Sequence, residues 1–256
     1  MTGRVTYSKS GTTGFVLFDR PEARNAMTWG MYEQLGAACR AISADRDVRV
    51  AVFRGAGGSF AAGTDIAQFL EFTGGESGIA YERQIEASIE LIEKVAKPVI
   101  ALVEGNCVGG GLVIAAACDL RIATPNARFG VPIARTLGNC LSPRNVSRLL
   151  SHFGPARTKR MLLLAELISA KEAESCGFVV RIVESSELEA VARELCTRIA
   201  AQAPITMMAA KEMIRRIGTA VAPDCDDLIR TVYGSSDFHE GVQAFVTKRP
   251  PNWRGE

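Results

Sequence analysis

The sequence has few of the residues from which metal sites and disulfide frameworks are built. It contains only two histidines, His152 and His239, and its seven cysteines are scattered singly without a C-x-x-C pair. No histidine or cysteine spacing resembles a zinc site, and isolated cysteines are typical of reduced, mostly buried thiols. We therefore expect a cytoplasmic protein without a metal.

The chain also lacks a long apolar run, a secretory signal and a strong charge. No stretch reaches the ~18 apolar residues of a membrane-spanning helix, and the N-terminus has no basic segment followed by an apolar one. The formal net charge is +2, whereas a nucleic-acid-binding protein needs a clustered basic face. These absences argue against membrane and nucleic-acid partners. What remains is a globular protein of 256 residues, long enough to bury a large core.

Strand and helix patterns alternate along most of the chain. We expect strands over 4–8, 14–18, 48–54, 99–103, 120–123 and 178–183, and helices over 28–43, 80–95 and 109–118. Gly74, Gly75 and Gly78 predict a flexible stretch before the helix at 80–95. Alternating strands and helices indicate an α/β fold. We divide it into a core, 1–198, and a helical region, 199–256, that packs on a partner subunit or back on the core.

Two glycine-containing segments follow predicted strands and open predicted helices. The first, 60–66, reads Phe-Ala-Ala-Gly-Thr-Asp-Ile, and the second, 105–111, ends in three glycines. Taken alone, the first segment is also typical of a plain connection between a strand and a helix. The second, taken alone, is also typical of glycines that allow tight helix packing. Helix starts carry free N–H groups that favour negative oxygen. Together, one backbone N–H group from each segment would form an oxyanion hole for a thioester enolate, each donor contributing about 2.7–4 kcal/mol.

The order of these segments resembles the crotonase superfamily, also called the enoyl-CoA hydratase/isomerase family, over nearly the whole chain. The segments that carry the resemblance are 19–27, 60–66, 97–111, 118–123 with 129–132, and 240–249. The resemblance implies an α/β, crotonase-like spiral of ββα repeats with a C-terminal helical trimerisation region. It also implies homotrimers or hexamers built as dimers of trimers. No metal or redox cofactor is implied, and coenzyme A is part of the substrate.

The resemblance also implies roles for individual residues. The oxyanion N–H groups fall on Thr64 and Gly110. Residues expected along the path of coenzyme A are Arg24, Ala26, Ala62, Asp65 and Ile66, with Phe245 and Lys248 reaching it from a neighbouring subunit. A solvated lysine is an equally good interpretation of Lys248.

Two positions depart from the family's pattern. The family's hydratases carry one glutamate a helical turn after the second oxyanion glycine and another after the Phe-Gly-x-Pro turn. Here these positions hold Val113 and Ile133. A positioned acid or base contributes roughly 10²–10⁴-fold to a rate, and neither aliphatic side chain can act as one. Ordinary hydration of a double bond is therefore not expected.

Other polar residues lie near the expected site in the sequence. Arg135 could pair with a substrate carboxylate, and Asn139 is close by. Cys140 could act as acid or base only with a shifted pKa. A structural role is the stronger interpretation for each of the three. Glu71 and Glu82 could border the acyl pocket, although solvation at the surface is favoured for both.

Several functions stay open at this point. The leading one is an enzyme that acts on an acyl-CoA through an enolate. Decarboxylation of a malonyl-type CoA fits the missing glutamates, because loss of carbon dioxide forms the enolate without a base. An isomerase with a non-standard acid/base and a non-catalytic acyl-CoA-binding protein are the alternatives. RNA binding, known for a lysine-rich offshoot of the family, is not expected, because the predicted helix 28–43 contains Arg40 and no lysine.

Overall fold

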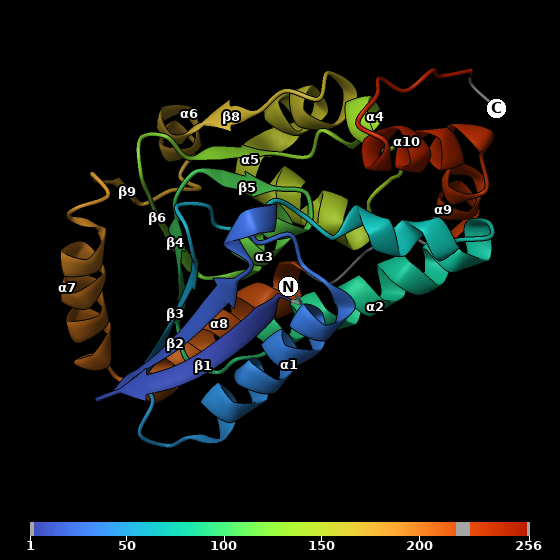
Figure 1. Cartoon of the computed structure of the whole chain (residues 1–256). Coiled ribbons are helices and arrows are strands. Elements are labelled where there is room, and N and C mark those ends of the chain that lie inside the picture. Colours follow the sequence, from blue (N-terminus) through green and yellow to red (C-terminus); the bar gives the residue numbers. More distant parts are fainter. Residues whose placement is uncertain (1–2, 219–225, 255–256) are drawn as a thin grey trace.

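The computed structural model describes residues 3–218 and 226–254, which form a mixed α/β fold around one large sheet (Figure 1). β1 runs antiparallel to β2, and every later pair in this sheet is parallel. The six strands follow the order β1 (Arg4–Ser10), β2 (Thr13–Asp19), β3 (Val50–Gly55), β4 (Val99–Val103), β6 (Leu120–Ala123) and β9 (Arg181–Ile182). The predicted strands are thus confirmed, although the last one is shorter than expected.

Different helices cover the two faces of this sheet. β4 is buried along its whole length, and its side chains alternate between two cores because successive side chains of a strand point to opposite faces. Ala101 and Val103 belong to the larger core, and Leu102 belongs to the smaller one. The larger core is covered by α1 (Trp29–Ala44), α2 (Gly75–Glu93), α3 (Gly110–Ala117) and α5 (Pro143–Leu163), and the smaller one by α7 (Leu188–Ala200).

A second, smaller sheet was not expected from the sequence. It consists of β5 (Asn106–Val108), β7 (Arg128–Gly130) and β8 (Ile168–Ser169). Strands of two or three residues carry no detectable alternation of apolar and polar side chains, so pattern analysis misses them. β5 matters for the site, because it directly precedes the glycines that open α3.

The C-terminal region is helical, as predicted, within the part of it that the structure describes; residues 219–225 and 255–256 lie outside. It contains α8 (Pro204–Gly218), α9 (Asp226–Tyr233) and α10 (Ser236–Val246). α9 and α10 lie against the start of α2 and against η2 (Ile66–Glu71), on the right of Figure 1. The short helices η1 (Pro21–Ala23), α4 (Ile133–Thr136) and α6 (Ala170–Ser175) complete the structure. Among the described helices, none has both the length and the apolar composition needed to cross a membrane.

The glycines at the start of α2 form a docking surface for α9, so the predicted flexible stretch at 74–78 is wrong. α2 begins at Gly75. A Cβ atom on Gly75 would overlap the backbone of Arg230, and one on Gly78 would overlap the ring of Tyr233. Because these glycines lack side chains, α9 comes close enough to place Tyr233 beside α2. The glycines therefore serve close packing rather than mobility.

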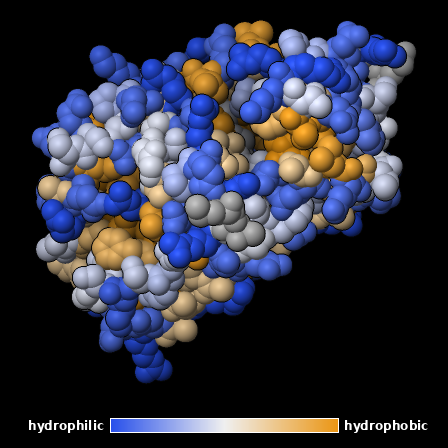
Figure 2. Space-filling model, viewed as in Figure 1, coloured by the Kyte–Doolittle hydropathy of each residue, from blue (hydrophilic) through white to orange (hydrophobic). Residues whose placement is uncertain are grey.

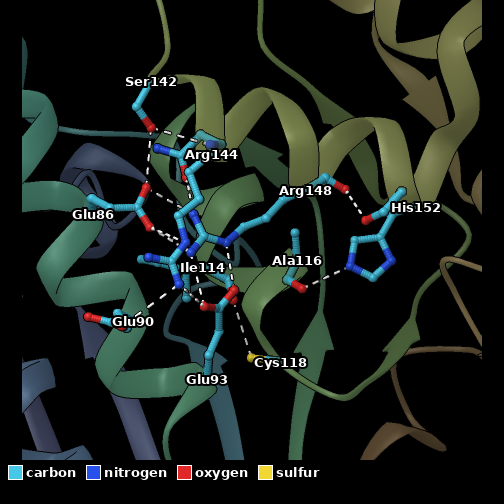
Figure 3. A network of polar contacts seen from close by, with 12 residues as sticks. Glu86, Glu90, Glu93, Ile114, Ala116, Cys118, Ser142, Arg144, Arg148 and His152 are labelled. Atoms are coloured by element: carbon cyan, nitrogen blue, oxygen red, sulfur yellow. Dashed lines mark hydrogen bonds and ion pairs between the residues drawn. The ribbon is translucent and has the colours of Figure 1, made fainter. Parts of the chain in front are cut away.

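A network of ion pairs fastens α2 to α5 (Figure 3). The guanidinium of Arg148 is almost buried, with 8% of its side chain exposed. It donates to Glu93 at 2.6 Å and to Glu86 at 2.7 Å. The hydroxyl of Ser142, at the start of α5, donates to Glu86 at 3.2 Å. The network therefore fixes the position of Ser142 relative to α2.

Replacing Arg148 tests how much this network contributes to stability. Arg148→Met removes the main cation between Glu86 and Glu93 and leaves their carboxylates partly buried, so we expect the free energy of unfolding to fall by about 3–5 kcal/mol. Lys94→Met removes an exposed partner of Glu90 and should change it by less than about 1 kcal/mol. Urea unfolding measures both. Equal losses in the two variants would contradict the structural importance of the network.

Candidate functional site

The segment 61–65 is held between two neighbouring stretches of backbone. On one side Ala62 N donates to Arg24 O at 3.0 Å, and Met27 N donates to Gly63 O at 2.8 Å. On the other side it forms a parallel bridge between Ala61 and Cys107 of β5. The position of Thr64 is therefore set by hydrogen bonds from both sides.

The glycines of the two segments meet at this point. Gly63 and Gly109 have φ values of 98° and 54°, which a residue with a side chain rarely adopts. A Cβ atom on Gly109 would lie 3.5 Å from the Cα of Gly63. Within the described residues, the backbone N–H groups of Thr64 and Gly110 donate to no acceptor. Gly110 is the first residue of α3, so its N–H has no partner within the helix. Thr64 N takes no part in the hydrogen bonds that join its segment to the two flanking stretches. Two free donors thus lie on adjoining segments.

The side chain of Thr64 takes part in a buried chain of hydroxyl groups. Its Oγ1 lies 2.9 Å from the hydroxyl of Tyr32 on α1 and 3.1 Å from that of Tyr81 on α2. Burial raises the pKa of Tyr32 to about 12 and holds that of Tyr81 well above its usual value. Both phenols therefore keep their protons, and together they fix the orientation of Thr64.

The two positions at which the resemblance implies glutamates are apolar and belong to the core. Val113 on α3 is fully buried, and Ile133 at the start of α4 is partly buried against the same core. Neither position supplies a charge or a hydrogen bond from its side chain. A ligand beside Gly110 would meet hydrocarbon on this side.

The structure brings together five of the residues predicted to contact coenzyme A. Hydrogen bonds from Ala62 N to Arg24 O and from Asp65 N to Met27 O join the two backbone stretches. Ala26 and Ile66 lie next to these joined residues in the sequence. Asp65 also pairs with Arg20 at 2.8 Å and caps η2. Figure 2 shows apolar residues beside a hollow in the surface, between the regions of α10 and η2.

The two predicted residues from the tail lie apart from this group. Phe245, at the end of α10, is half exposed, and Lys248 is exposed just beyond it. They are open to contact with another molecule, and their predicted role across a subunit boundary stays a prediction.

The three acid/base candidates after α4 have different surroundings. Arg135 is exposed, and its guanidinium has no ion-pair partner in residues 3–218 and 226–254. Asn139 donates through Nδ2 to the hydroxyl of Tyr233 at 3.3 Å. Burial, with the nearby charge of Glu82, raises the pKa of Cys140 to about 12. Cys140 thus stays a neutral thiol at neutral pH, which argues against a role as a base.

Glu82 is buried, so the expectation that it is solvated at the surface is wrong; Glu71 is exposed, as expected. The Glu82 residue is only 3% exposed. Its carboxyl accepts from the hydroxyl of Tyr233 at 2.7 Å and from Ser142 N at 2.7 Å. The sequence contained the signal for this placement, since Glu82 lies on the apolar stripe of α2 that continues through Ile85 and Ile89.

Potential metal ligands do not gather anywhere in the described part of the chain: no three histidine, cysteine, aspartate or glutamate side chains lie close enough to share an ion. His152 instead contacts the backbone oxygen of Ala116 at 3.0 Å, and burial lowers its pKa to about 4. It is a neutral core histidine.

Comparison with known proteins covers nearly the whole chain. The enoyl-CoA hydratase/isomerase family model matches residues 9–256. The chain is 34% identical to the short-chain-enoyl-CoA hydratase of Clostridium acetobutylicum, over 96% of this chain and 95% of the relative. It is 35% identical to the (E)-benzylidenesuccinyl-CoA hydratase of Thauera aromatica, over 98% and 99%. A solved structure of methylmalonyl-CoA decarboxylase with 2-nitronate-propionyl-CoA has a TM-score of 0.90, 27% identity and 99% coverage of both chains. Its likeness confirms the predicted fold class.

Replacing Thr64 tests the chain of hydroxyl groups. Thr64→Val keeps the shape of the side chain but leaves the buried hydroxyls of Tyr32 and Tyr81 without their shared partner. We expect a loss of about 1–3 kcal/mol in the free energy of unfolding. Thr197→Val, on the exposed side of α7, should cost less than about 0.5 kcal/mol. Thermal and urea unfolding measure both; a neutral Thr64→Val would show that the hydroxyl chain adds nothing.

Proposed function

This chain belongs to the enoyl-CoA hydratase/isomerase family, and we propose that it binds an acyl-CoA thioester and stabilises the thioester enolate. The observation that carries the proposal is the pair of backbone N–H groups on Thr64 and Gly110, which have no acceptor in the described chain. Thr64 is buried and Gly110 is only partly exposed, and buried backbone donors normally have partners. A thioester oxygen between them would complete both hydrogen bonds.

These donors stabilise the negatively charged enolate oxygen more strongly than the oxygen of the neutral thioester. Two preorganised donors favour the state in which negative charge has developed. The apolar side chains of Val113 and Ile133 keep the surroundings low in polarity, which strengthens electrostatic interactions. The chain therefore stabilises the enolate with its backbone and requires few side chains for that step.

Decarboxylation of a malonyl-type CoA is the reaction that suits this site best. Breaking the bond to the carboxylate leaves an electron pair on the α-carbon, so no residue has to remove a proton. The missing carboxylates at Val113 and Ile133 favour this reaction over hydration. The similarity to a methylmalonyl-CoA decarboxylase structure, with a TM-score of 0.90, adds support. Hydration is the second candidate, because the curated relatives include hydratases at 34–35% identity.

We also propose that the active protein is a homo-oligomer, either a trimer or a hexamer. α8 has no buried residue in a single chain. Its exposed apolar side chains are Ile205, Met208, Met213, Ile214 and Ile217. A helix with this much apolar surface is stabilised by packing against another copy.

A direct assay tests the reaction. The purified protein, incubated with malonyl-CoA and methylmalonyl-CoA, should release carbon dioxide and form acetyl-CoA and propionyl-CoA, detected by mass spectrometry. Crotonyl-CoA serves as the hydration control and should remain unchanged. Hydration of crotonyl-CoA at a typical enzyme rate of ~10 s⁻¹ would contradict the proposal. Micromolar binding of thioesters without any turnover would instead favour a non-catalytic binding protein.

Closing the oxyanion hole tests the role of the backbone donors. A Cβ atom on Gly110 would lie 2.6 Å from the Tyr32 hydroxyl and 3.2 Å from Thr64 Oγ1. Gly110→Ala should therefore disturb the donor pair, and we expect turnover to fall by about 10²–10³-fold. Gly30→Ala is the matched control, because its Cβ would meet nothing within 4 Å. Similar turnover in the two variants, measured at equal folded fractions, would rule out a role of the two backbone donors in turnover.

A further inference from the structure

Glu82 differs from the other glutamates along α2 in having no cation beside it. Glu86 pairs with Arg144 and Arg148, and Glu93 pairs with the same two arginines. Glu90 pairs with Lys94, and Glu76 pairs with Arg230. In the part of the chain that the structure describes, no basic side chain forms an ion pair with Glu82, although it is the most buried of the five. Burying a carboxylate without a cation is costly, and such groups gather at functional sites.

The hydrogen bonds around Glu82 come from neutral donors. The hydroxyl of Tyr233 on α9 and the backbone N–H of Ser142 each donate to the carboxyl at 2.7 Å. Asn139 donates to the same hydroxyl, while its own Oδ1 is buried without a partner. A glutamine at position 82 could make two hydrogen bonds here without the cost of a buried charge. The feature that only a glutamate adds is a proton that can leave and return.

Glu82 is connected to the paired backbone donors through the aromatic residues beside it. Its neighbour on α2, Tyr81, contacts Thr64 Oγ1 at 3.1 Å. The rings of Tyr81 and Tyr233 are 6.0 Å apart between centroids. The charge of Glu82 contributes to the raised pKa values of Tyr32 and Tyr81. The carboxyl is therefore within electrostatic reach of the residues that hold Thr64.

We propose that Glu82, assisted by Tyr233, is the catalytic residue that transfers the proton at the α-carbon of the bound acyl-CoA. This inference rests on the proposed function. In decarboxylation the bond from the α-carbon to the carboxylate breaks, carbon dioxide leaves, and the electron pair moves to the thioester oxygen. The enolate then takes the proton of the Glu82 carboxyl at its α-carbon. The carboxylate then regains a proton that comes ultimately from solvent, while the hydroxyl of Tyr233 holds it in place by donating a hydrogen bond.

The protonation state of Glu82 suits this role. Burial raises its pKa to about 7, while the hydrogen bonds from Tyr233 and Ser142 act in the opposite direction. The titratable groups that interact with the carboxyl are Tyr32, Tyr81, Glu86, Cys140 and Tyr233. The nearby cations, Arg144 and Arg148 of α5, form ion pairs with Glu86. Both protonation states are therefore populated near neutral pH, so the carboxyl can donate and accept.

Hydrogen exchange at the α-carbon tests this proton transfer separately from carbon dioxide loss. Propionyl-CoA is incubated with the protein in D₂O, deuterium uptake is followed by mass spectrometry, and calorimetry gives the Kd. The wild type should exchange the α-protons, and Glu82→Gln should exchange them about 10²–10⁴-fold more slowly with a Kd within about threefold of the wild type. Glu90→Gln, on the same helix but paired with Lys94, should exchange at the wild-type rate.

The pH profile of exchange separates proton transfer from a structural role. If ionised Glu82 removes the α-proton, the rate of exchange should rise with pH and show an inflexion near pH 7, the pKa of Glu82. Tyr233→Phe removes a hydrogen bond that lowers the pKa of Glu82, so the inflexion should move to higher pH. An unmoved inflexion would overturn the proposal, and this measurement decides the matter even if Glu82→Gln does not fold.

The remaining outcomes distinguish the two proposals. Fast exchange in Glu82→Gln but slow exchange in Gly110→Ala overturns the role of Glu82 and leaves the enolate site standing. Binding of propionyl-CoA without exchange by the wild type also overturns the role of Glu82. No binding of propionyl-CoA by the wild type overturns the proposed function itself.

Discussion

The clamping of residues 61–65 between two other backbone stretches is the constraint on which the site depends. The bridge from Met27 to Thr64 and the bridge from Ala61 to Cys107 leave the middle segment no freedom to shift. Because α3 begins directly after β5, the same arrangement fixes Gly110. A side chain on Gly111 would collide with the backbone oxygen of Ala61. The glycines are therefore required by packing as well as by backbone conformation, and the two N–H groups are positioned before any ligand arrives.

The polar groups of α2 divide into two kinds according to their neighbours. Glu86, Glu90 and Glu93 face cations and fasten helices together. Glu82 faces a phenol, a backbone N–H and hydrocarbon, and its charge is left uncompensated. One helix thus carries both rigid connections and a group that can change its protonation state. The ion-pair network also affects Glu82, because it holds Ser142 at the start of α5, and the backbone N–H of Ser142 donates to the Glu82 carboxyl.

Most of the large sheet could be predicted from the sequence, because its strands depend on local features. Buried strands such as β4 are marked by apolar runs, and glycines at 63 and 109–111 mark close approaches. The small sheet could not be predicted, since its strands are too short to show a period. Gly75 and Gly78 were assigned to a flexible stretch because nothing local reveals that α9 packs on them. Glu82 was assigned to the surface although it continues the apolar stripe of α2, because its hydrogen-bond partners, Tyr233 and Ser142, are distant in sequence.

The docking of α9 on the glycines of α2 has a consequence for the order in which the protein is assembled. Tyr233 and Glu82 are separated by 151 residues along the chain. While the chain is being synthesised, the sheet and α2 leave the ribosome long before α9 does. During that interval the carboxyl of Glu82 lacks its phenolic partner, and Gly75 and Gly78 lack the helix that packs on them. The backbone donors therefore form early, and the enclosed carboxyl is completed only when the last helices pack. The order of synthesis thus separates the proposed binding part of the site from the part to which we assign proton transfer.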